Sequence, residues 1–294
     1  MGILFIVNPV AGKGKSLEYA AYIEQTLKEK AVDYALKFTS CKGEAEQIAR
    51  EAAYGIYEKI VAVGGDGTVY EVINGLVGGT AALGVIPAGT GNDFVKTIGI
   101  SQNLEEALET ILDGKSISID CGKVNDRYFI NVASVGLDAE IARKTEEIKR
   151  YISGPTAYVA GVFKTLFQYE LQPVEITIDD WSYKGKITLV AVGNGKYYGG
   201  GMKIVPTAEV DDGYFTICLV KPMSKLKMLR LFPTIFTGDH TKEPEVEILK
   251  GKKVKVHSRE PMILNTDGDI IGTTPVTFEV IENRIAVIVA GKDT

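Results

Sequence analysis

Two patterns of hydrophobic and polar positions follow one another along this chain. Up to about Lys115, short continuous apolar runs such as 3–7 and 59–63 alternate with stretches of helical period. From Ile117 onward, apolar residues mostly recur at every second position, with turn residues between the runs. The first pattern predicts an α/β domain with a parallel sheet and helices on both faces. The second predicts a mainly antiparallel β-sandwich domain.

The same periodicities predict the residue ranges of the individual helices and strands. In the first part we expect strands at 3–7, 33–39, 59–63 and 83–86, and helices at 17–30, 43–54 and 104–112. In the second part we expect strands at 128–135, 174–178, 186–192, 214–220, 245–249, 254–257, 262–265, 276–280 and 285–289, and helices at 137–150, 155–168 and 224–236. The boundary between the parts is a change of period, because the composition does not shift there.

The stretch Gly64–Thr68 combines three glycines with one carboxylate, between an apolar strand and a helical stretch. Glycines let the backbone turn sharply and approach a ligand, and the N–H groups that open the following helix favour an anion. Asp66 would repel a phosphate unless a divalent cation lay between them. The turn therefore predicts a nucleotide together with Mg²⁺. The alternative is a glycine turn whose acid only caps the helix.

Two further loops follow strands of the same predicted sheet. Asn8–Ser16 is basic and contains glycine, but Pro9 stands where a Walker A sequence requires its first glycine. Pro87–Phe94 again places Gly, Thr and Asp after a strand. Because ligands bind outside the carboxyl ends of parallel strands, we expect the three loops to converge on one crevice.

Composition and charge exclude some classes of protein and indicate the compartment. The formal net charge of −5 argues against nucleic-acid binding, which requires a basic surface. Cys41, Cys121 and Cys218 are widely spaced, which indicates free thiols in a reducing compartment. We interpret residues 2–7 as a first strand and not as a targeting segment, and polar residues interrupt the apolar stretch 151–167. We therefore expect a cytoplasmic protein that does not span the membrane.

Several stretches of the second part carry candidate chemistry, each with an ordinary alternative. The loop 194–202 holds aromatic residues and glycines that suit either a ligand wall or a wide turn. Asp211–Gly213 suits Mg²⁺ or Ca²⁺, although a metal-free hairpin turn is the more frequent meaning of such a sequence. Asp267–Asp269 suits a general base or a solvated turn. The basic and apolar stretch 221–232 suits an anionic membrane surface or a core-packed helix with solvated lysines.

Taken in order, these motifs resemble the bacterial diacylglycerol kinase family of soluble lipid kinases, relatives of sphingosine kinases and, more distantly, of NAD kinases. The markers fall within Asn8–Gly12, Gly64–Gly75, Pro87–Phe94, Asp120–Lys123, Tyr128–Asn131, Gly154–Tyr158 and Asp211–Gly213. The resemblance covers nearly the whole chain. It implies an ATP-binding α/β domain over 1–120 and a β-rich domain for a lipid substrate over 121–284, with residues 285–294 packing back on the first domain.

The resemblance also implies roles for individual residues. ATP would be held by Asn8, Pro9, Val10, Ala11, Gly12, Thr39, Gly65, Asp66, Gly67, Thr68, Val69, Tyr70, Glu71 and Thr90. The catalytic Mg²⁺ would be supported by Asp66, Asp93 and Asp120. A second, structural Mg²⁺ would be held by Asp212 with backbone oxygens of Glu209 and Tyr214.

The catalytic base of the family is a Glu after Asp-Gly, and the matching residue here is Asp269, which is one methylene shorter. The resemblance implies ATP- and Mg²⁺-dependent transfer of the γ-phosphoryl group to the hydroxyl of diacylglycerol or a related lipid, giving phosphatidic acid. Asp269 would take the hydroxyl proton. We expect a peripheral protein that reaches its lipid from the membrane surface and forms a homodimer.

Two other functions are consistent with the same sequence. One is a kinase of another lipid or of a soluble alcohol such as NAD, because the central glycine turn also fits NAD kinases. The other is a nucleotide- or lipid-binding regulator that has lost catalysis, for which Asp269 in place of Glu is the direct hint.

Overall fold

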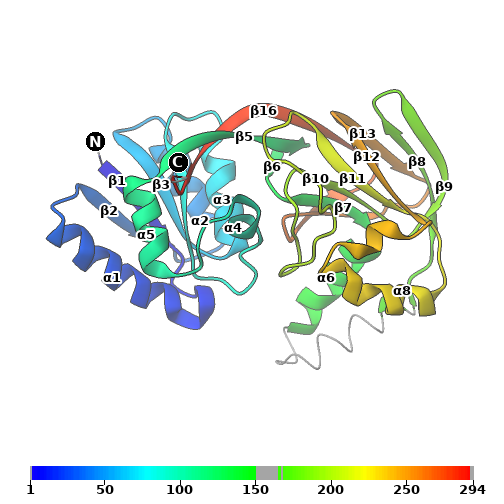
Figure 1. The fold of residues 1–294 in the computed structure, drawn as a ribbon, viewed down its shortest axis with the longest axis horizontal. Coiled ribbons are helices and arrows are strands. Elements are labelled where there is room, and N and C mark those ends of the chain that lie inside the picture. The colour runs from blue at the N-terminus through cyan, green and yellow to red at the C-terminus, as the bar shows by residue number, and fades with distance from the viewer. Residues whose placement is uncertain (1, 150–164, 167, 292–294) are drawn as a thin grey trace.

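The computed structural model describes residues 2–149, 165–166 and 168–291, and its first part is a parallel sheet enclosed by helices (Figure 1). The strands lie in the order β2, β1, β3, β4. They are β1 (Gly2–Val7), β2 (Tyr34–Phe38), β3 (Tyr57–Gly64) and β4 (Ala82–Pro87). β1, β3 and β4 carry continuous runs of buried apolar residues, because both faces of the sheet are covered.

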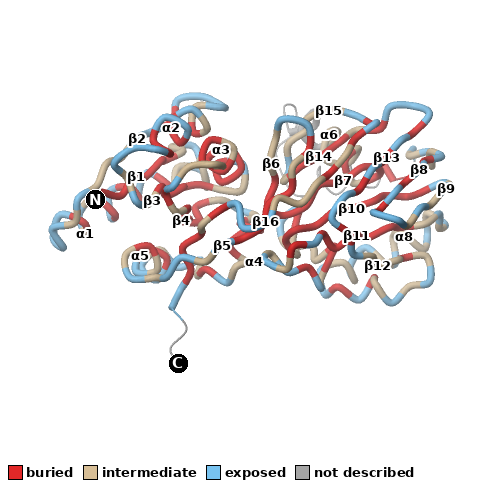
Figure 2. The backbone as a smooth tube through the Cα atoms, turned by 90° about the horizontal axis from the view of Figure 1, so that it is seen from above, coloured by how far each residue is buried: buried red, intermediate tan, exposed pale blue. Residues whose placement is uncertain are grey.

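Helices form the two outer layers of this part. They are α1 (Lys15–Glu29), α2 (Glu44–Ala52), α3 (Asp66–Leu76), α4 (Asp93–Ile98) and α5 (Leu104–Asp113). Figure 2 shows α2 and α3 on one side of the sheet and α1 and α5 on the other. α3 and α4 begin directly in the loops after β3 and β4, so the starts of both helices lie at the carboxyl edge of the sheet.

The second part is a sandwich of antiparallel strands. One sheet has the order β12 (Val246–Gly251), β11 (Phe215–Val220), β10 (Leu189–Gly193), β7 (Val132–Gly136), β14 (Ile263–Thr266) and β15 (Asp269–Thr273). The facing layer contains β5 (Lys115–Val124), β6 (Arg127–Phe129), β8 (Gln172–Ile178), β9 (Trp181–Ile187), β13 (Lys253–Ser258) and β16 (Val276–Val289). Phe129, Phe215 and Phe278 pack together in the core between the sheets. The predicted fold class is therefore confirmed.

β16 belongs to both parts of the molecule (Figure 1). Its first half pairs with β13, it pairs with β5 along most of its length, and Val287 pairs in parallel with Leu83 of β4. Ile285 and Ile288 lie in the same core as β1 and β3. We expected two strands here, at 276–280 and 285–289. The structure has one strand with a register break between Ile281 and Ile285.

Other elements differ from the expected ones for local reasons. The stretch 128–135 divides into β6 and β7, and 186–192 divides into β9 and β10. The stretch 224–236 is a short helix, α8 (Lys225–Leu231), followed by a 3₁₀ turn with Pro233 near its start, which cannot continue an α-helical hydrogen-bond ladder. The expected helix 137–150 is α6 (Leu137–Lys149). Most of the expected helix 155–168 lies outside the described residues.

Within the part of the chain that the structure describes, every helix is too short or too polar to cross a lipid bilayer.

Candidate active site

The loops after β1, β3 and β4 meet at one cavity of about 600 Å³, so the predicted convergence is confirmed. The segment between β2 and α2 supplies a further wall. The lining residues are Asn8, Pro9, Val10, Ala11, Gly12, Thr39, Ser40, Cys41, Lys42, Ala45, Gly65, Gly67, Thr68, Glu71, Gly89 and Asp269. A cavity at the carboxyl ends of parallel strands is where open α/β sheets bind their ligands. We call it the nucleotide cavity.

Glycines at the contacts between loops permit this convergence. Gly12 has a φ of 59°, and a Cβ at this position would lie 2.1 Å from the Ala88 carbonyl oxygen. A Cβ on Gly89 would lie 2.4 Å from the Cα of Gly65. Both distances are far below van der Waals contact, so a larger residue at either position would push the loops apart.

Side chains tie the cavity walls to one another. Asn8 Nδ2 donates a 3.1 Å hydrogen bond to Thr68 Oγ1, which joins the loop after β1 to the first turn of α3. Glu71 Oε1 accepts a 2.9 Å hydrogen bond from the N–H of Gly43 at the start of α2. The N-terminus of α3 therefore borders the cavity, where its backbone N–H groups suit an anion.

Four residues that we expected to hold a nucleotide do not line this cavity. Val69 and Tyr70 are buried on the inner side of α3, and the Tyr70 hydroxyl accepts a 3.4 Å hydrogen bond from Nε of Arg127. Thr90 is exposed next to the cavity wall. Asp66 lines the neighbouring crevice. The side chains of Val69 and Tyr70 therefore do not face this cavity, and only their backbone atoms are left for the predicted contact with a nucleotide.

Asp66 and Asp93 form an acidic pair at the starts of α3 and α4. Asp66 Oδ1 accepts a 2.6 Å hydrogen bond from the Asp93 N–H, and Asp93 Oδ2 accepts one of 2.7 Å from the Gly200 N–H. A Cβ on Gly91 would lie 2.6 Å from Asp66 Oδ2 and 3.7 Å from Asp93 Oδ2, so both oxygens border one small space. Burial, and next the charge of Asp93, raise the pKa of Asp66. Two carboxylates that repel each other in this way fit a divalent cation.

Asp120 is placed differently from this pair. Its side chain is buried, Oδ1 accepts a 2.8 Å hydrogen bond from the Asn283 N–H, and Oδ2 accepts one of 2.7 Å from the Gly213 N–H. Asp120 lines neither the nucleotide cavity nor the crevice beside it. It joins β5 to the irregular part of β16 and to the 211–213 turn. Its support of the catalytic Mg²⁺ stays a prediction.

The residues of the second predicted Mg²⁺ site gather around a lysine. Asp212 Oδ1 accepts a 3.0 Å hydrogen bond from the Tyr214 N–H, and Asp212 Oδ2 lies 2.7 Å from Lys250 Nζ. The hydrogen bond that Lys250 donates to Asp212, and then the nearby charges of Asp212 and Glu209, raise the pKa of Lys250. A metal here would share Asp212 with the ammonium group. Among the described residues there is no cluster of three acidic, His or Cys side chains, so this site also stays a prediction.

Asp269, the predicted base, begins β15 at the junction of two spaces. It lines the nucleotide cavity, and it also lines the crevice that holds Asp66 and Asp93. Its side chain is 18% exposed and forms an ion pair with Lys42. The shorter side chain thus reaches both spaces from its position on the strand.

Asp267, the other acid of this turn, is engaged with the backbone. Its carboxylate accepts hydrogen bonds of 2.9 to 3.0 Å from the N–H groups of Ile130, Asn131 and Val132. Burial raises the pKa of Asp267 to about 7, although these three donors oppose the rise. Asp267 therefore holds the turn that carries Asp269, and the role of Asp269 as the base stays a prediction.

The crevice beside the nucleotide cavity has a volume of about 530 Å³. Gly67 and Asp269 line both spaces. The polar lining consists of Asp66, Asp93, Asn131, Asp138, Asn265, Asp267 and Asp269, and the apolar lining includes Leu137, Ile141, Leu189, Phe232 and Ile235. Tyr197–Gly200 and Met202 form one wall, so part of the 194–202 loop is a cavity wall. We call this space the acceptor crevice.

An apolar cavity of about 260 Å³ lies beside the acceptor crevice. It shares with the crevice the side chains of Leu137, Ile141, Leu189, Phe232 and Ile235. Met228 and Leu229 of α8 also line it, whereas Leu226 of the same helix is 75% exposed. The stretch 221–232 therefore packs one side on a cavity and presents the other to the surface.

Sequence reasoning did not find Lys42, Asp138 or Asn265. Asp138 follows a strand and stands in the first turn of a helix, as Asp66 and Asp93 do, so the same strand–turn–helix signal could have found it. Lys42 and Asn265 carry no such local signal, because their places depend on contacts between distant segments.

Known proteins share this two-part organisation. Residues 2–124 match the family profile of the diacylglycerol kinase catalytic domain, and residues 131–289 match that of the YegS C-terminal NAD kinase beta sandwich-like domain. This chain belongs to the diacylglycerol kinase family. It is therefore a kinase, and its phosphoryl donor is a nucleotide.

Individual relatives of the family match almost end to end. Diacylglycerol kinase of Staphylococcus epidermidis is 33% identical over 284 residues, which cover 96% of this chain and 90% of that protein. Diacylglycerol kinase of Staphylococcus carnosus is 32% identical and covers 96% and 93%. The structure of a diacylglycerol kinase from Bacillus anthracis str. Sterne matches with a TM-score of 0.77 at 28% identity, covering 98% of this chain and 96% of that one.

Proposed function

We propose that this family member transfers the γ-phosphoryl group of ATP to the free hydroxyl of diacylglycerol, or of a closely related lipid, and so forms phosphatidic acid. The observation that carries the proposal is that three neighbouring spaces share lining residues. The nucleotide cavity and the acceptor crevice share Gly67 and Asp269, and the crevice and the apolar cavity share five side chains. An acceptor with one hydroxyl end and long apolar chains matches this change from acidic to apolar lining.

The reaction requires positioning and charge neutralisation and no protein nucleophile. Asp269 accepts the proton of the acceptor hydroxyl while the hydroxyl oxygen bonds to the γ-phosphorus and the bond to the bridging β,γ-oxygen breaks. Lys42 pairs with Asp269 from the nucleotide cavity, where its ammonium offsets negative charge on the transferred group. The products are ADP and the phosphorylated lipid.

The donor side would use the residues that converge on the nucleotide cavity. The loops after β1, β3 and β4 and the N-terminus of α3 would hold the phosphates. Mg²⁺, when bound, supplies neutralisation of phosphate charge. Asp66 and Asp93 fit it on the geometry described above, and Asp120 and the Asp212 site are proposed only from the family resemblance.

We further propose that the lipid enters from the membrane surface at the side of α8. Leu226, Phe232 and Phe236 are 75%, 39% and 46% exposed, and Phe232 also lines the acceptor crevice. Exposed apolar side chains beside a cavity can enter the interfacial layer of a bilayer while the protein remains on its surface. The homodimer expected from the family resemblance is checked by light scattering in solution.

The direct test is Mg²⁺-dependent transfer of labelled γ-phosphate from ATP to diacylglycerol in mixed micelles, with NAD and other lipids in parallel reactions. We expect labelled phosphatidic acid from the wild type and none from Asp66→Ala. Labelling of NAD alone would assign a soluble acceptor. Nucleotide binding without transfer to any acceptor would favour a regulator.

Cys41 offers an independent test of nucleotide binding. It is exposed and lines the nucleotide cavity, whereas Cys121 and Cys218 are buried, and burial raises the pKa of each of these two thiols to about 12. An alkylating reagent should therefore modify Cys41 first. We expect bound ATP to slow this reaction. An alkylation rate that ATP leaves unchanged would exclude this cavity as the nucleotide site.

A further inference from the structure

Four buried polar side chains gather around one end of α6 with atoms that have no hydrogen-bond partner among the described residues. The atoms are Ser134 Oγ, both carboxylate oxygens of Asp138, the Tyr169 hydroxyl and Asn265 Oδ1. Buried polar atoms are nearly always paired in folded proteins, since an unpaired one destabilises the fold. Such a concentration indicates that something other than the protein pairs with them.

Rigid elements fix the positions of this group. β7 and β14 pair so that Ser134 lies directly opposite Asn265, and Asp138 stands in the first turn of α6, just after β7. Ser134 is fully buried and Asn265 is 5% exposed. Asp138 and Asn265 both line the acceptor crevice.

Asp138 and Asn265 adjoin residues of both the acidic and the apolar lining of the acceptor crevice. Asn265 is two residues before Asp267, which belongs to the acidic lining, and Asp138 adjoins Leu137, which also lines the apolar cavity. A lipid that extends from the acidic pair to the apolar cavity would place the atoms next to its hydroxyl beside Asp138 and Asn265.

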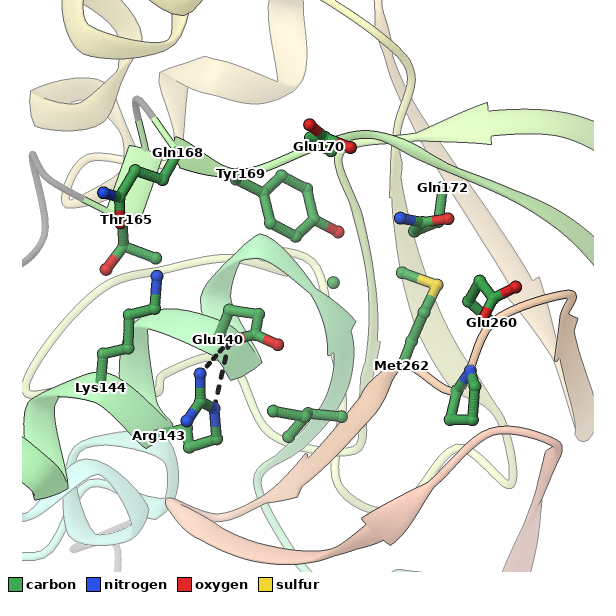
Figure 3. Close-up of a pocket in the computed structure, with 13 residues that line it drawn as sticks. Glu140, Arg143, Lys144, Thr165, Gln168, Tyr169, Glu170, Gln172, Glu260 and Met262 are labelled. Carbon is green, nitrogen blue, oxygen red and sulfur yellow. Dashed lines mark hydrogen bonds and ion pairs between the residues drawn. The ribbon is translucent and has the colours of Figure 1, made fainter.

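A polar hollow of about 270 Å³ lies beside α6 (Figure 3). Glu140, Arg143 and Lys144 line that hollow, and Glu140 and Arg143 form an ion pair of 3.0 Å. The basic residues of this part of α6 therefore line the hollow and not the crevice. Tyr169, the fourth member of the group, lines the hollow as well, and burial raises the pKa of its hydroxyl.

The donor capacity of the group decides what it can bind. Burial raises the pKa of the Asp138 carboxyl, against smaller opposite effects of the nearby Ser134 and Tyr198 hydroxyls and of backbone N–H groups at the start of α6. A raised pKa favours the neutral carboxyl, which donates its O–H, as the Ser134 hydroxyl can, and the Asn265 side-chain amide adds N–H donors. A ligand group that only accepts hydrogen bonds matches these donors. Diacylglycerol carries two such groups beside its hydroxyl, the ester carbonyls.

We propose that Asp138 and Asn265, backed by the buried Ser134, form a subsite for the ester carbonyl oxygens beside the reacting hydroxyl, and that Asp138 selects ester-linked acceptors. This inference rests on the proposed lipid kinase function. Asp138 is then a specificity-determining residue, and it takes no part in proton transfer.

The test compares a 1,2-diacylglycerol with the dialkyl ether analogue of equal chain length, which lacks both carbonyls. For the wild type we expect kcat/KM to be about tenfold higher with the ester, since a lost hydrogen bond changes binding by about this factor. Asp138→Leu should raise KM for the ester about tenfold and leave kcat and the KM of the ether unchanged. Asp138→Asn should keep most of the ester preference, because its amide still donates.

Ser134→Ala is the milder second variant, expected to raise KM for the ester alone by about threefold. Asp180→Leu, in the exposed turn between β8 and β9, is the matched control and should behave as the wild type. ATP protection of Cys41 reports that each variant is folded on the donor side.

Three results would overturn the inference. The first is an equal rise of KM for ester and ether in Asp138→Leu and Ser134→Ala, which would mean that the group only shapes the wall. The second is unchanged KM with higher stability of Asp138→Leu, as expected of a group paired only with buried water. The third is a wild-type preference for a long-chain amino alcohol that Asp138→Asn abolishes, because this requires an ionised Asp138. A wild type that phosphorylates no lipid at all would instead reject the proposed function itself.

Discussion

The nucleotide cavity and the acceptor crevice are built in different ways, although Asp269 lines both. The nucleotide cavity consists of short loops, each directly after a strand of one parallel sheet, and its loops meet through contacts such as that of Gly12 with Ala88. The crevice consists mainly of side chains from α6, β10 and β14, the 197–202 loop and the turn after α8, which are far apart along the chain.

The two kinds of construction suit two different tasks in the reaction, namely phosphate binding and selection of the acceptor. A cavity made of glycines and backbone N–H groups suits phosphates, which are the same in every turnover. A crevice made of side chains can be altered one residue at a time to select among acceptors. Substitutions on the donor side should therefore stop transfer to every acceptor, whereas those on the acceptor side should change the KM of the lipid alone.

The largest effect is expected at the acidic pair. Asp66→Asn removes one charge at the place where negative phosphate charge must be neutralised, so kcat should fall about 10³-fold with every acceptor. The measurement is labelled phosphate transfer to diacylglycerol and to its ether analogue. A loss confined to one of the two would contradict the division between the sides.

A smaller loss is expected at the residue that the two spaces share. Asp269→Asn keeps the shape of the side chain but cannot accept the hydroxyl proton, so kcat should fall about 10²-fold with little change in either KM. Asp269→Glu, which restores the family residue, should retain activity. If Asp269→Asn turned over as the wild type does, another group would have to be the base.

A substitution at the exposed rim of the acceptor crevice tests the acceptor side alone. Phe232→Asp places a charge where Phe232 borders both the crevice and the apolar cavity, and the lost apolar contact should raise KM for diacylglycerol about tenfold. Because Phe232 is 39% exposed, the variant should fold. Tyr54→Asp, at an aromatic residue 72% exposed in the first part, is the control and should leave KM unchanged. A rise of the KM for ATP in Phe232→Asp would show that the two sides are not separate.

The smallest effect concerns pH and again involves the acceptor side. His240 is buried against the apolar cavity, its Nε2 donates a 3.1 Å hydrogen bond to the Ile204 carbonyl, and burial lowers its pKa from 6.5. Below that value the unfolded chain binds a proton that the folded protein excludes, so the free energy of unfolding should fall as the pH falls. In His240→Gln this fall should be smaller, as measured by urea unfolding at pH 7 and at pH 5.5. The exposed His257→Gln is the control, and equal slopes for the two variants would exclude the role of His240.

The donor side could largely be predicted from the sequence, because its signals are local. Gly64–Thr68 and Pro87–Phe94 each lie between a continuous apolar strand and a helix, and parallel strands bring such loops to one edge. Tyr70 shows the limit of this reasoning. A motif names consecutive residues, but a helix turns every fourth side chain toward the same face, so Tyr70 lies inside and Glu71 borders the cavity.

The acceptor side could not be predicted in the same way. Ser134 and Asn265 become neighbours only through the pairing of β7 with β14. The periodicity of the two stretches does not predict the register of that pairing. The sequence did not predict β16 as a single strand, for a related reason. Its polar residues 282–284 interrupt the apolar alternation, and Asn283 has a φ of 49°, so the pattern of one long strand looks like two short ones.

β16 also determines how this chain could be divided and recombined. The first part of the molecule needs Val287 beside Leu83 of β4 and Ile285 in its core, yet these residues come from a distant stretch of the chain. A cut between residues 124 and 131 would therefore not release two self-sufficient modules. A chimera that exchanged acceptor specificity between relatives would therefore need two junctions. Its first part would have to keep both its own N-terminal elements and its own β16.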